Sequence, residues 1–193
     1  HNAALILLKK FSLEPNKDVA LVVAGPTSNR LSAVEAGRID ATLLTPSELP
    51  RSRKQGLVEV YDLADMGIEV QGNGFATSRS FIKSQRDTVL SALKGYVEAI
   101  HYIHRNRDET RKIIAKYLRL TDGEVLDATY TAFVKTVAKR PTPTLKGIQF
   151  MLDEVAAKMP NAKSARPDQF VDLSLLQQLD KEGFFAEMAK RYP

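Results

Sequence analysis

The sequence contains no cysteine, so disulfide bonds, thiolate metal sites and a cysteine nucleophile are excluded. Several catalytic motifs are also absent: there is no Gly-x-Ser-x-Gly elbow, Walker loop, dinucleotide glycine fingerprint or aspartate-rich calcium loop. No apolar run approaches the roughly 18 residues that a membrane-spanning helix needs. The composition, with 44% hydrophobic and 26% charged residues, is ordinary for a globular protein. None of the motifs in the sequence requires the protein to be an enzyme.

The excess of positive charge is spread along the chain. A net charge of +5 and a pI of about 9.4 would suit nucleic acid or acidic lipid as a partner. Lysine and arginine, however, usually stand near aspartate or glutamate, and residues 51–54 are the only dense basic patch. We therefore expect a solvated basic surface and no nucleic-acid partner.

Alternating strand-like and helix-like segments in the first part of the chain predict an α/β fold. Residues 19–24 and 39–44 are continuous apolar runs, which suit strands covered on both faces. Residues 57–63 alternate like a third strand, and residues 75–81 are a further strand candidate. Helical segments separate the first three runs, and Gly37 is placed to end the first of these helices.

From residue 84 onward, apolar residues recur at three- and four-residue spacing, which predicts a series of helices. Thr121 and Glu124 have the spacing of a capping box before one of them. The glycine-containing stretch at 67–74 suits a crossing between lobes. We therefore predict an α/β subdomain over residues 1–66, an inter-lobe crossing over 67–74, and a strand followed by helices over 75–193.

Polar residues follow two of the predicted strands where a helix begins. Thr27, Ser28 and Asn29 come after the first buried run, and Thr45 and Ser47 come after the second. Backbone N–H groups and hydroxyls at such helix N-termini can bind a carboxylate, sulfonate or nitrate, although a plain helix cap explains each group equally well. Both groups would lie on one edge of the sheet, so we predict that they border a ligand cleft.

Two asparagines complete the candidate ligand-binding residues: Asn2 at the start of the first helical segment, and Asn73 between two glycines of the crossing. No residue is assigned a catalytic role, and no cofactor is expected. His101 and His104 stand three apart on the long helix and could form a metal pair, but no third ligand is clustered with them. We expect this pair to flank the core face of the helix and to bind no metal.

Several stretches, spread over nearly the whole chain, share the pattern of one known family. They are Leu8-Lys9-Lys10-Phe11 with Leu13-Glu14-Pro15 and Asp18-Val19, residues 31–41, residues 72–79, residues 81–83, residues 86–89 and the helical tail. In these stretches the chain resembles the nitrate/sulfonate/taurine-type substrate-binding proteins of bacterial ABC importers. That family also includes binding proteins for thiamine-precursor pyrimidines.

The resemblance implies a type II periplasmic-binding-protein-like fold with two lobes. The chain would supply most of the second lobe and the C-terminal helical part of the first lobe. The family's first lobe begins with strands and helices that are not in this sequence, so the resemblance also implies an N-terminally incomplete chain. We expect residues 1–193 to be stable only when that missing portion is present.

The implied function is the capture of a small anionic or organic solute in an inter-lobe cleft, without chemistry, for an ABC transporter membrane permease. The implied location is periplasmic or extracytoplasmic, either free or as a membrane-anchored lipoprotein, and the full-length protein would be a monomer. Two other classes stay open. One is an enzyme like the pyrimidine-precursor synthases, against which the lack of cysteine argues, and the other is the effector-sensing domain of a transcription regulator.

Overall fold

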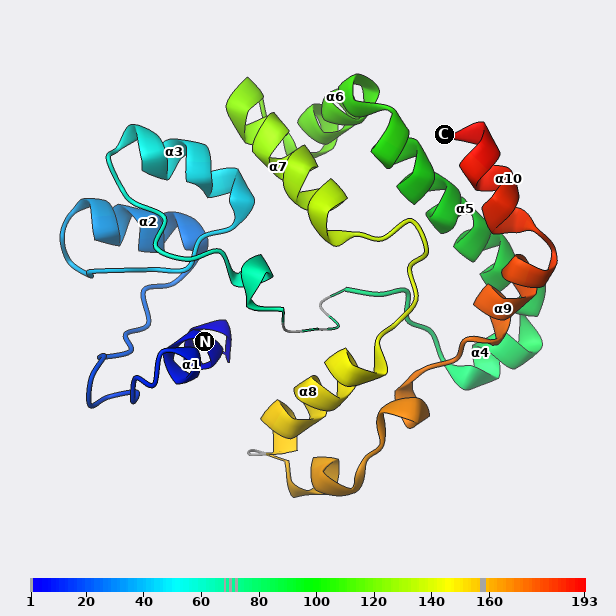
Figure 1. The fold of residues 1–193 in the computed structure, drawn as a ribbon, viewed down its shortest axis with the longest axis horizontal. Coiled ribbons are helices and arrows are strands. Elements are labelled where there is room, and N and C mark those ends of the chain that lie inside the picture. The colour runs from blue at the N-terminus through cyan, green and yellow to red at the C-terminus, as the bar shows by residue number, and fades with distance from the viewer. Residues whose placement is uncertain (1, 68, 70, 72, 157–158) are drawn as a thin grey trace. The chain divides into compact units, whose positions relative to one another are not determined.

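The computed structural model describes residues 2–67, 69, 71, 73–156 and 159–193, and its regular elements are helices (Figure 1). The α-helices are α1 (Asn2–Lys10), α2 (Thr27–Glu35), α3 (Leu49–Lys54), α4 (Arg79–Ser84), α5 (Arg86–Arg105), α6 (Arg107–Leu118), α7 (Gly123–Thr136), α8 (Leu145–Ala156), α9 (Ser174–Lys181) and α10 (Phe184–Arg191). Short 3-10 helices are η1 (Pro46–Glu48), η2 (Leu63–Met66), η3 (Pro160–Ser164) and η4 (Pro167–Phe170). Residues 68, 70 and 72 of the predicted crossing lie outside the described residues.

The predicted α/β fold, and with it the type II periplasmic-binding-protein-like architecture, is wrong for the part of the chain that the structure describes. No sheet forms among the described residues. The predicted strands at 19–24, 39–44 and 57–63 are mostly irregular, apart from one isolated bridge between Pro15 and Val19. The predicted strand at 75–81 instead leads into α4.

The reason for this error lies in strand pairing. A strand is stable only when its backbone N–H and C=O groups pair with a neighbour, whereas an apolar run indicates only that a segment should be covered. Val22 and Val23 expose 64% and 102% of their surface, and Val58 and Val60 expose 83% and 87%. These runs have the composition of strands, but in the described residues they form no strand ladder.

The chain divides into two compact units. Unit 1 comprises His1–Met66 and Arg111–Phe133, and unit 2 comprises Gly67–Thr110 and Val134–Pro193. Helices α6 and α7 each contribute residues to both units. The predicted division assumed a two-lobed protein with a sheet, and its parts were residues 1–66, 67–74 and 75–193. That division stays a prediction.

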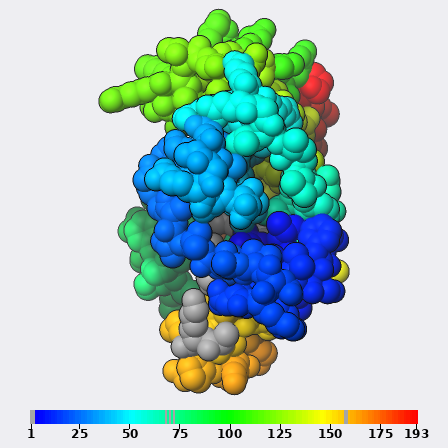
Figure 2. All heavy atoms as spheres, turned by 90° about the vertical axis from the view of Figure 1, so that its left-hand side faces the viewer, coloured from blue at the N-terminus to red at the C-terminus, as the bar shows by residue number. Residues whose placement is uncertain are grey.

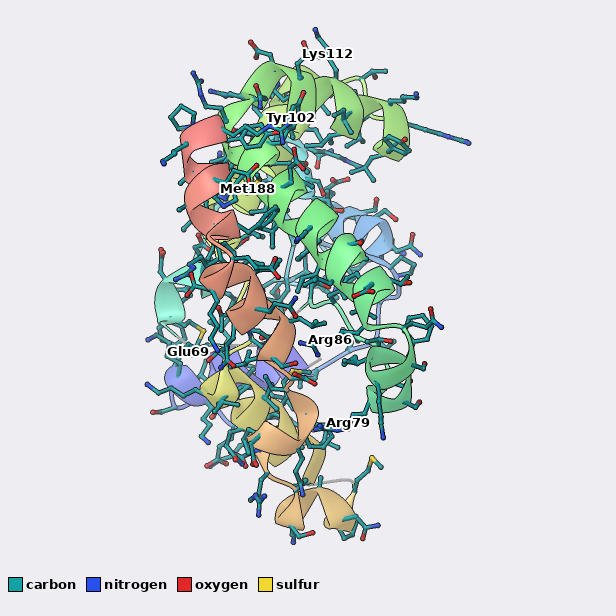
Figure 3. All side chains as sticks on the ribbon, turned by 90° about the vertical axis from the view of Figure 1, so that its right-hand side faces the viewer. Glu69, Arg79, Arg86, Tyr102, Lys112 and Met188 are labelled. Atoms are coloured by element: carbon teal, nitrogen blue, oxygen red, sulfur yellow. The ribbon has the colours of Figure 1, made fainter. Side chains whose placement is uncertain are left out.

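In unit 2, the core forms between α5 and the C-terminal helices. The apolar spacing of α5 places Val89, Leu90 and Leu93 on one face, where they pack with Leu175 and Leu179 of α9. Figure 3 shows α9 and α10, which carries Met188, running alongside α5, and Met188 is only 1% exposed. The packing of this apolar stripe, more than helix propensity, therefore holds α9 and α10 in place.

Polar contacts at the edges of this core set the register of the helices. The Arg86 guanidinium donates to Gln178 Oε1 at 2.9 Å, and Lys94 lies 3.2 Å from the Glu182 carboxylate. Near the other end of α5, the Tyr192 hydroxyl donates to Glu98 at 2.9 Å. Because these pairs are partly or fully exposed, they direct the packing more than they stabilise it.

In unit 1, ion pairs connect α3 with α2 and with α7. Arg51 of α3 pairs with Glu35 of α2 at 3.0 Å, and Lys54 pairs with Glu124 of α7 at 2.7 Å. Figure 2 shows the end of α3, in cyan, against the green surface of the α6–α7 region. Leu31 of α2 is completely buried, so this helix contributes to the apolar interior of unit 1.

We predict that Leu179→Ala lowers the free energy of unfolding by about 2–5 kcal/mol, because Leu179 is fully buried against α5 and the truncation leaves a cavity. The measurement is urea denaturation followed by circular dichroism. Leu145→Ala is the matched control, since Leu145 is 49% exposed on α8 and its truncation should cost under about 1 kcal/mol. Equal losses for the two variants would contradict the assignment of the core.

We also predict that replacing Val22, Val23, Val58 and Val60 together by threonine lowers the fluorescence of bound anilinonaphthalene sulfonate. Threonine has nearly the same shape as valine, but its hydroxyl makes these exposed runs less apolar. The helical circular dichroism signal should not change, because none of the four residues lies in a helix. Undiminished dye fluorescence would mean that these valines are covered in solution.

Candidate functional site

Thr27, Ser28 and Asn29 form the first turn of α2. Gly25 adopts a left-handed backbone conformation, with φ of +78°, and Pro26 is the N-cap residue. Among the described residues, no side chain caps this helix, so neither Thr27 nor Ser28 has the capping role that the sequence suggested as one reading. Ser28 and Asn29 are exposed at this helix end, while Thr27 is half-buried.

Arg30 is a neighbour of this turn that sequence reasoning missed. Its Nη2 donates to the Thr27 hydroxyl at 2.7 Å, and its Nε is buried with no acceptor among the described residues. A helix N-terminus carries partial positive charge, so a guanidinium in the first turn is unfavourable for the helix alone and favourable beside a bound anion. In the sequence, the signal for this contact is an arginine three residues after a threonine at a predicted helix start.

Thr45 and Ser47 lie together around η1, but their polar groups are already engaged. The Thr45 N–H donates to Glu48 Oε2 at 3.0 Å, and the Thr45 hydroxyl also contacts this carboxylate. The Ser47 hydroxyl lies 2.9 Å from the Thr45 hydroxyl. Glu48 therefore completes a capping box, and its negative charge would repel an anion placed at the same N-terminus.

The two asparagines lie in different units. Asn2 begins α1 in unit 1, whereas Asn73 is exposed in unit 2. The Asn73 backbone carbonyl accepts a hydrogen bond from Gln71 Nε2 at 2.7 Å. Gln71 Oε1 in turn accepts from the Thr144 N–H at 3.2 Å, so Gln71 links Asn73 to the start of α8.

The basic patch at residues 51–54 is compensated by carboxylates within unit 1. Arg51 pairs with Glu35, Arg53 with Glu59 at 2.9 Å, and Lys54 with Glu124. The hydrogen bond from Glu124 raises the pKa of Lys54 above its usual value. These pairs leave little net positive potential over the patch, and the absence of a nucleic-acid partner stays a prediction.

His101 and His104 occupy different environments on α5. His101 is 3% exposed, and His104 Nε2 lies 2.8 Å from the Val137 carbonyl oxygen, to which it donates. In the described part of the chain, no group of three or more histidine, cysteine, aspartate or glutamate side chains could hold a metal ion. None of the described helices combines the length and apolar character needed to cross a membrane.

A family model described as NMT1/THI5 like matches residues 3–110, more than half of the chain. The chain belongs to the NMT1/THI5-like family. A search of curated proteins found no match, and a search of solved structures found none either. The NMT1/THI5-like match includes α2, η1 and Asn73, and of the candidate ligand-binding residues only Asn2 lies outside it.

The extent of the NMT1/THI5-like match differs from what the sequence pattern suggested. The resemblance was expected to cover nearly the whole chain, but residues 111–193 lie outside the matched region. Those residues include α9 and α10, which pack against α5 in the unit 2 core. The match also does not distinguish the nitrate, sulfonate or taurine type within the family.

For the capping box, we predict that Thr45→Ala lowers the free energy of unfolding by about 1 kcal/mol, because Glu48 loses its hydroxyl partner at the start of η1. Thr45→Ser is the control, since it keeps the hydroxyl and should stay within about 0.5 kcal/mol of the unchanged chain. Urea denaturation measures both. A Thr45→Ser variant as unstable as Thr45→Ala would show that the methyl group, not the capping hydroxyl, is what matters.

Proposed function

We propose that this chain is part of the substrate-binding component of a bacterial ABC importer, which captures a small anionic or organic solute. Membership of the NMT1/THI5-like family carries the proposal, because that family includes nitrate-, sulfonate- and taurine-binding proteins. The captured solute would pass to a membrane permease. The protein would act outside the cytoplasm as a monomer, perform no chemistry and require no cofactor.

The first turn of α2 is the part of the candidate site best suited to an anion. Its backbone N–H groups lack a side-chain cap, and Ser28 and Asn29 are exposed beside them. The Arg30 guanidinium, whose buried Nε has no acceptor in the described chain, adds a full positive charge three residues away from Thr27. An anionic group bound here would offset both the helix dipole and this guanidinium.

The Thr45–Ser47 turn is less suited to the same role. Its hydroxyls are directed to one another and to Glu48, so a ligand would have to displace a carboxylate. We therefore assign Thr45 and Ser47 to positioning α3, and we assign the recognition of negative charge to the α2 end. Asn2 and Asn73 stay candidate ligand-binding residues under this proposal.

The test is titration calorimetry of the purified protein with nitrate, taurine, a short alkyl sulfonate and an aminopyrimidine, each measured separately. We expect an anionic compound to bind, and Arg30→Gln to weaken it by about 10-fold or more, since a hydrogen bond to a charged group contributes about 1.5–3 kcal/mol. Arg38→Gln is the matched control, because Arg38 is an exposed arginine just after the same helix.

Two results would contradict the proposal. If none of the four compounds binds to a protein that is folded by circular dichroism, solute capture of this class is wrong. If an anion binds and both arginine variants weaken it equally, the effect is one of net charge, and the α2 end is not the recognition point.

A further inference from the structure

The connection between α7 and α8, residues 137–144, is hydrogen-bonded at both ends to other parts of unit 2. At its start, the Val137 carbonyl accepts a hydrogen bond from His104 of α5 at 2.8 Å. At its end, the Thr144 N–H donates to Gln71 at 3.2 Å, and the Thr144 hydroxyl contacts the Glu69 carboxylate. We call residues 137–144 the α7–α8 connection.

Beside the Val137 anchor, the α7–α8 connection approaches a buried ionisable group. His101 is one helical turn before His104 on α5, and only 3% of its surface is exposed. Neither of its ring nitrogens has a hydrogen-bond partner among the described residues. The Lys139 backbone comes near the ring and favours its protonated form, but it does not complete a hydrogen bond.

The surroundings of His101 favour the neutral ring. Burial is the largest cause that lowers the pKa of His101 below its usual value, and the nearby Lys139 and His104 side chains add to it. Among the described residues, these two side chains are the charged or titratable groups that lower the pKa of the ring. Arg140, the next residue of the connection, is already paired with Asp180 of α9 and lies over the Phe185 ring at 4.5 Å.

The sign of the pH effect follows from this lowered pKa. In the unfolded chain His101 takes up a proton near its ordinary pKa of about 6.5, whereas in the folded chain it resists protonation. The unfolded or opened form therefore binds more protons in mild acid. The stabilising effect of the neutral ring is fully present above about pH 6.5 and is lost as the pH falls below that value.

We propose that the α7–α8 connection is a pH-sensitive latch, closed over His101 when the ring is neutral and released from α5 when the ring is protonated. The connection is the part that moves because it has no regular secondary structure, whereas α5 is fixed by the apolar cluster with α9. Release removes Lys139 from the ring and admits water to it. Because Thr144 holds Gln71 and Glu69, release also weakens the support of these two residues. This device does not rest on the proposed solute-binding function.

The test is hydrogen exchange of the backbone amides, followed by mass spectrometry at about pH 7.5 and about pH 5.5 and corrected for the intrinsic exchange rate. In the unchanged protein, we expect protection of residues 137–144 to fall at least about threefold at the lower pH, while residues 89–100 of α5 keep theirs. His101→Leu fills the same buried place without a titrating group, so its protection should be equal at both pH values. His104→Gln is the matched control, because its amide can still donate to Val137 and the pH effect should persist.

A second measurement keeps the proposal testable if His101→Leu fails to fold. Nuclear magnetic resonance titration of the unchanged protein follows the ring proton of His101 and the amide signals of residues 137–144. We expect both to change with the same midpoint, below about pH 6.5. The latch is wrong if the connection is equally protected at both pH values, if His101→Leu keeps the pH effect, or if the amide signals follow a different midpoint.

Discussion

The contact between α5 and α9 is the interaction on which unit 2 depends. Val89, Leu90 and Leu93 give α5 an apolar stripe, and Leu175 and Leu179 meet it from a part of the chain far away in sequence. Without this contact α9 and α10, each eight residues long, would be too short to persist as helices in water. The ordered α5 is in turn the support for His101, His104 and the connection that crosses them.

The helices of unit 2 could be predicted from the sequence, because their signal is contained within each segment. The three- and four-residue spacing through α5 identifies both the helix and its buried face. In unit 1, the start of α7 was likewise located to within a residue, although the capping group differs from the expected one. Asp122, not Thr121, accepts the N–H groups of Glu124 and Val125, at 2.8 and 3.2 Å. Such choices between neighbouring polar residues depend on backbone angles that spacing does not report.

The strands could not be predicted in the same way, because a strand depends on a partner that its own sequence does not name. Residues 19–24 have the composition of a buried strand, yet Val23 is fully exposed. The candidate site was also predicted only in part, but for a different reason. The sequence located the first turn of α2 and the turn at η1. It could not show that Thr45 is already hydrogen-bonded to Glu48, or that Arg30 donates to the Thr27 hydroxyl. Both are side-chain contacts within a single turn.

The exposed valines of unit 1 also bear on how this chain behaves at high concentration. Extended, apolar and unpaired segments are templates for strand pairing between molecules, and hence for aggregation. Glu59 separates Val58 from Val60, and its carboxylate is held by Arg53 at 2.9 Å. A charged side chain between two apolar ones makes stacking of identical segments costly, because the carboxylates would be brought together. Residues 19–24 have no such charge, so this run is less protected than the segment around Glu59 against pairing with another molecule.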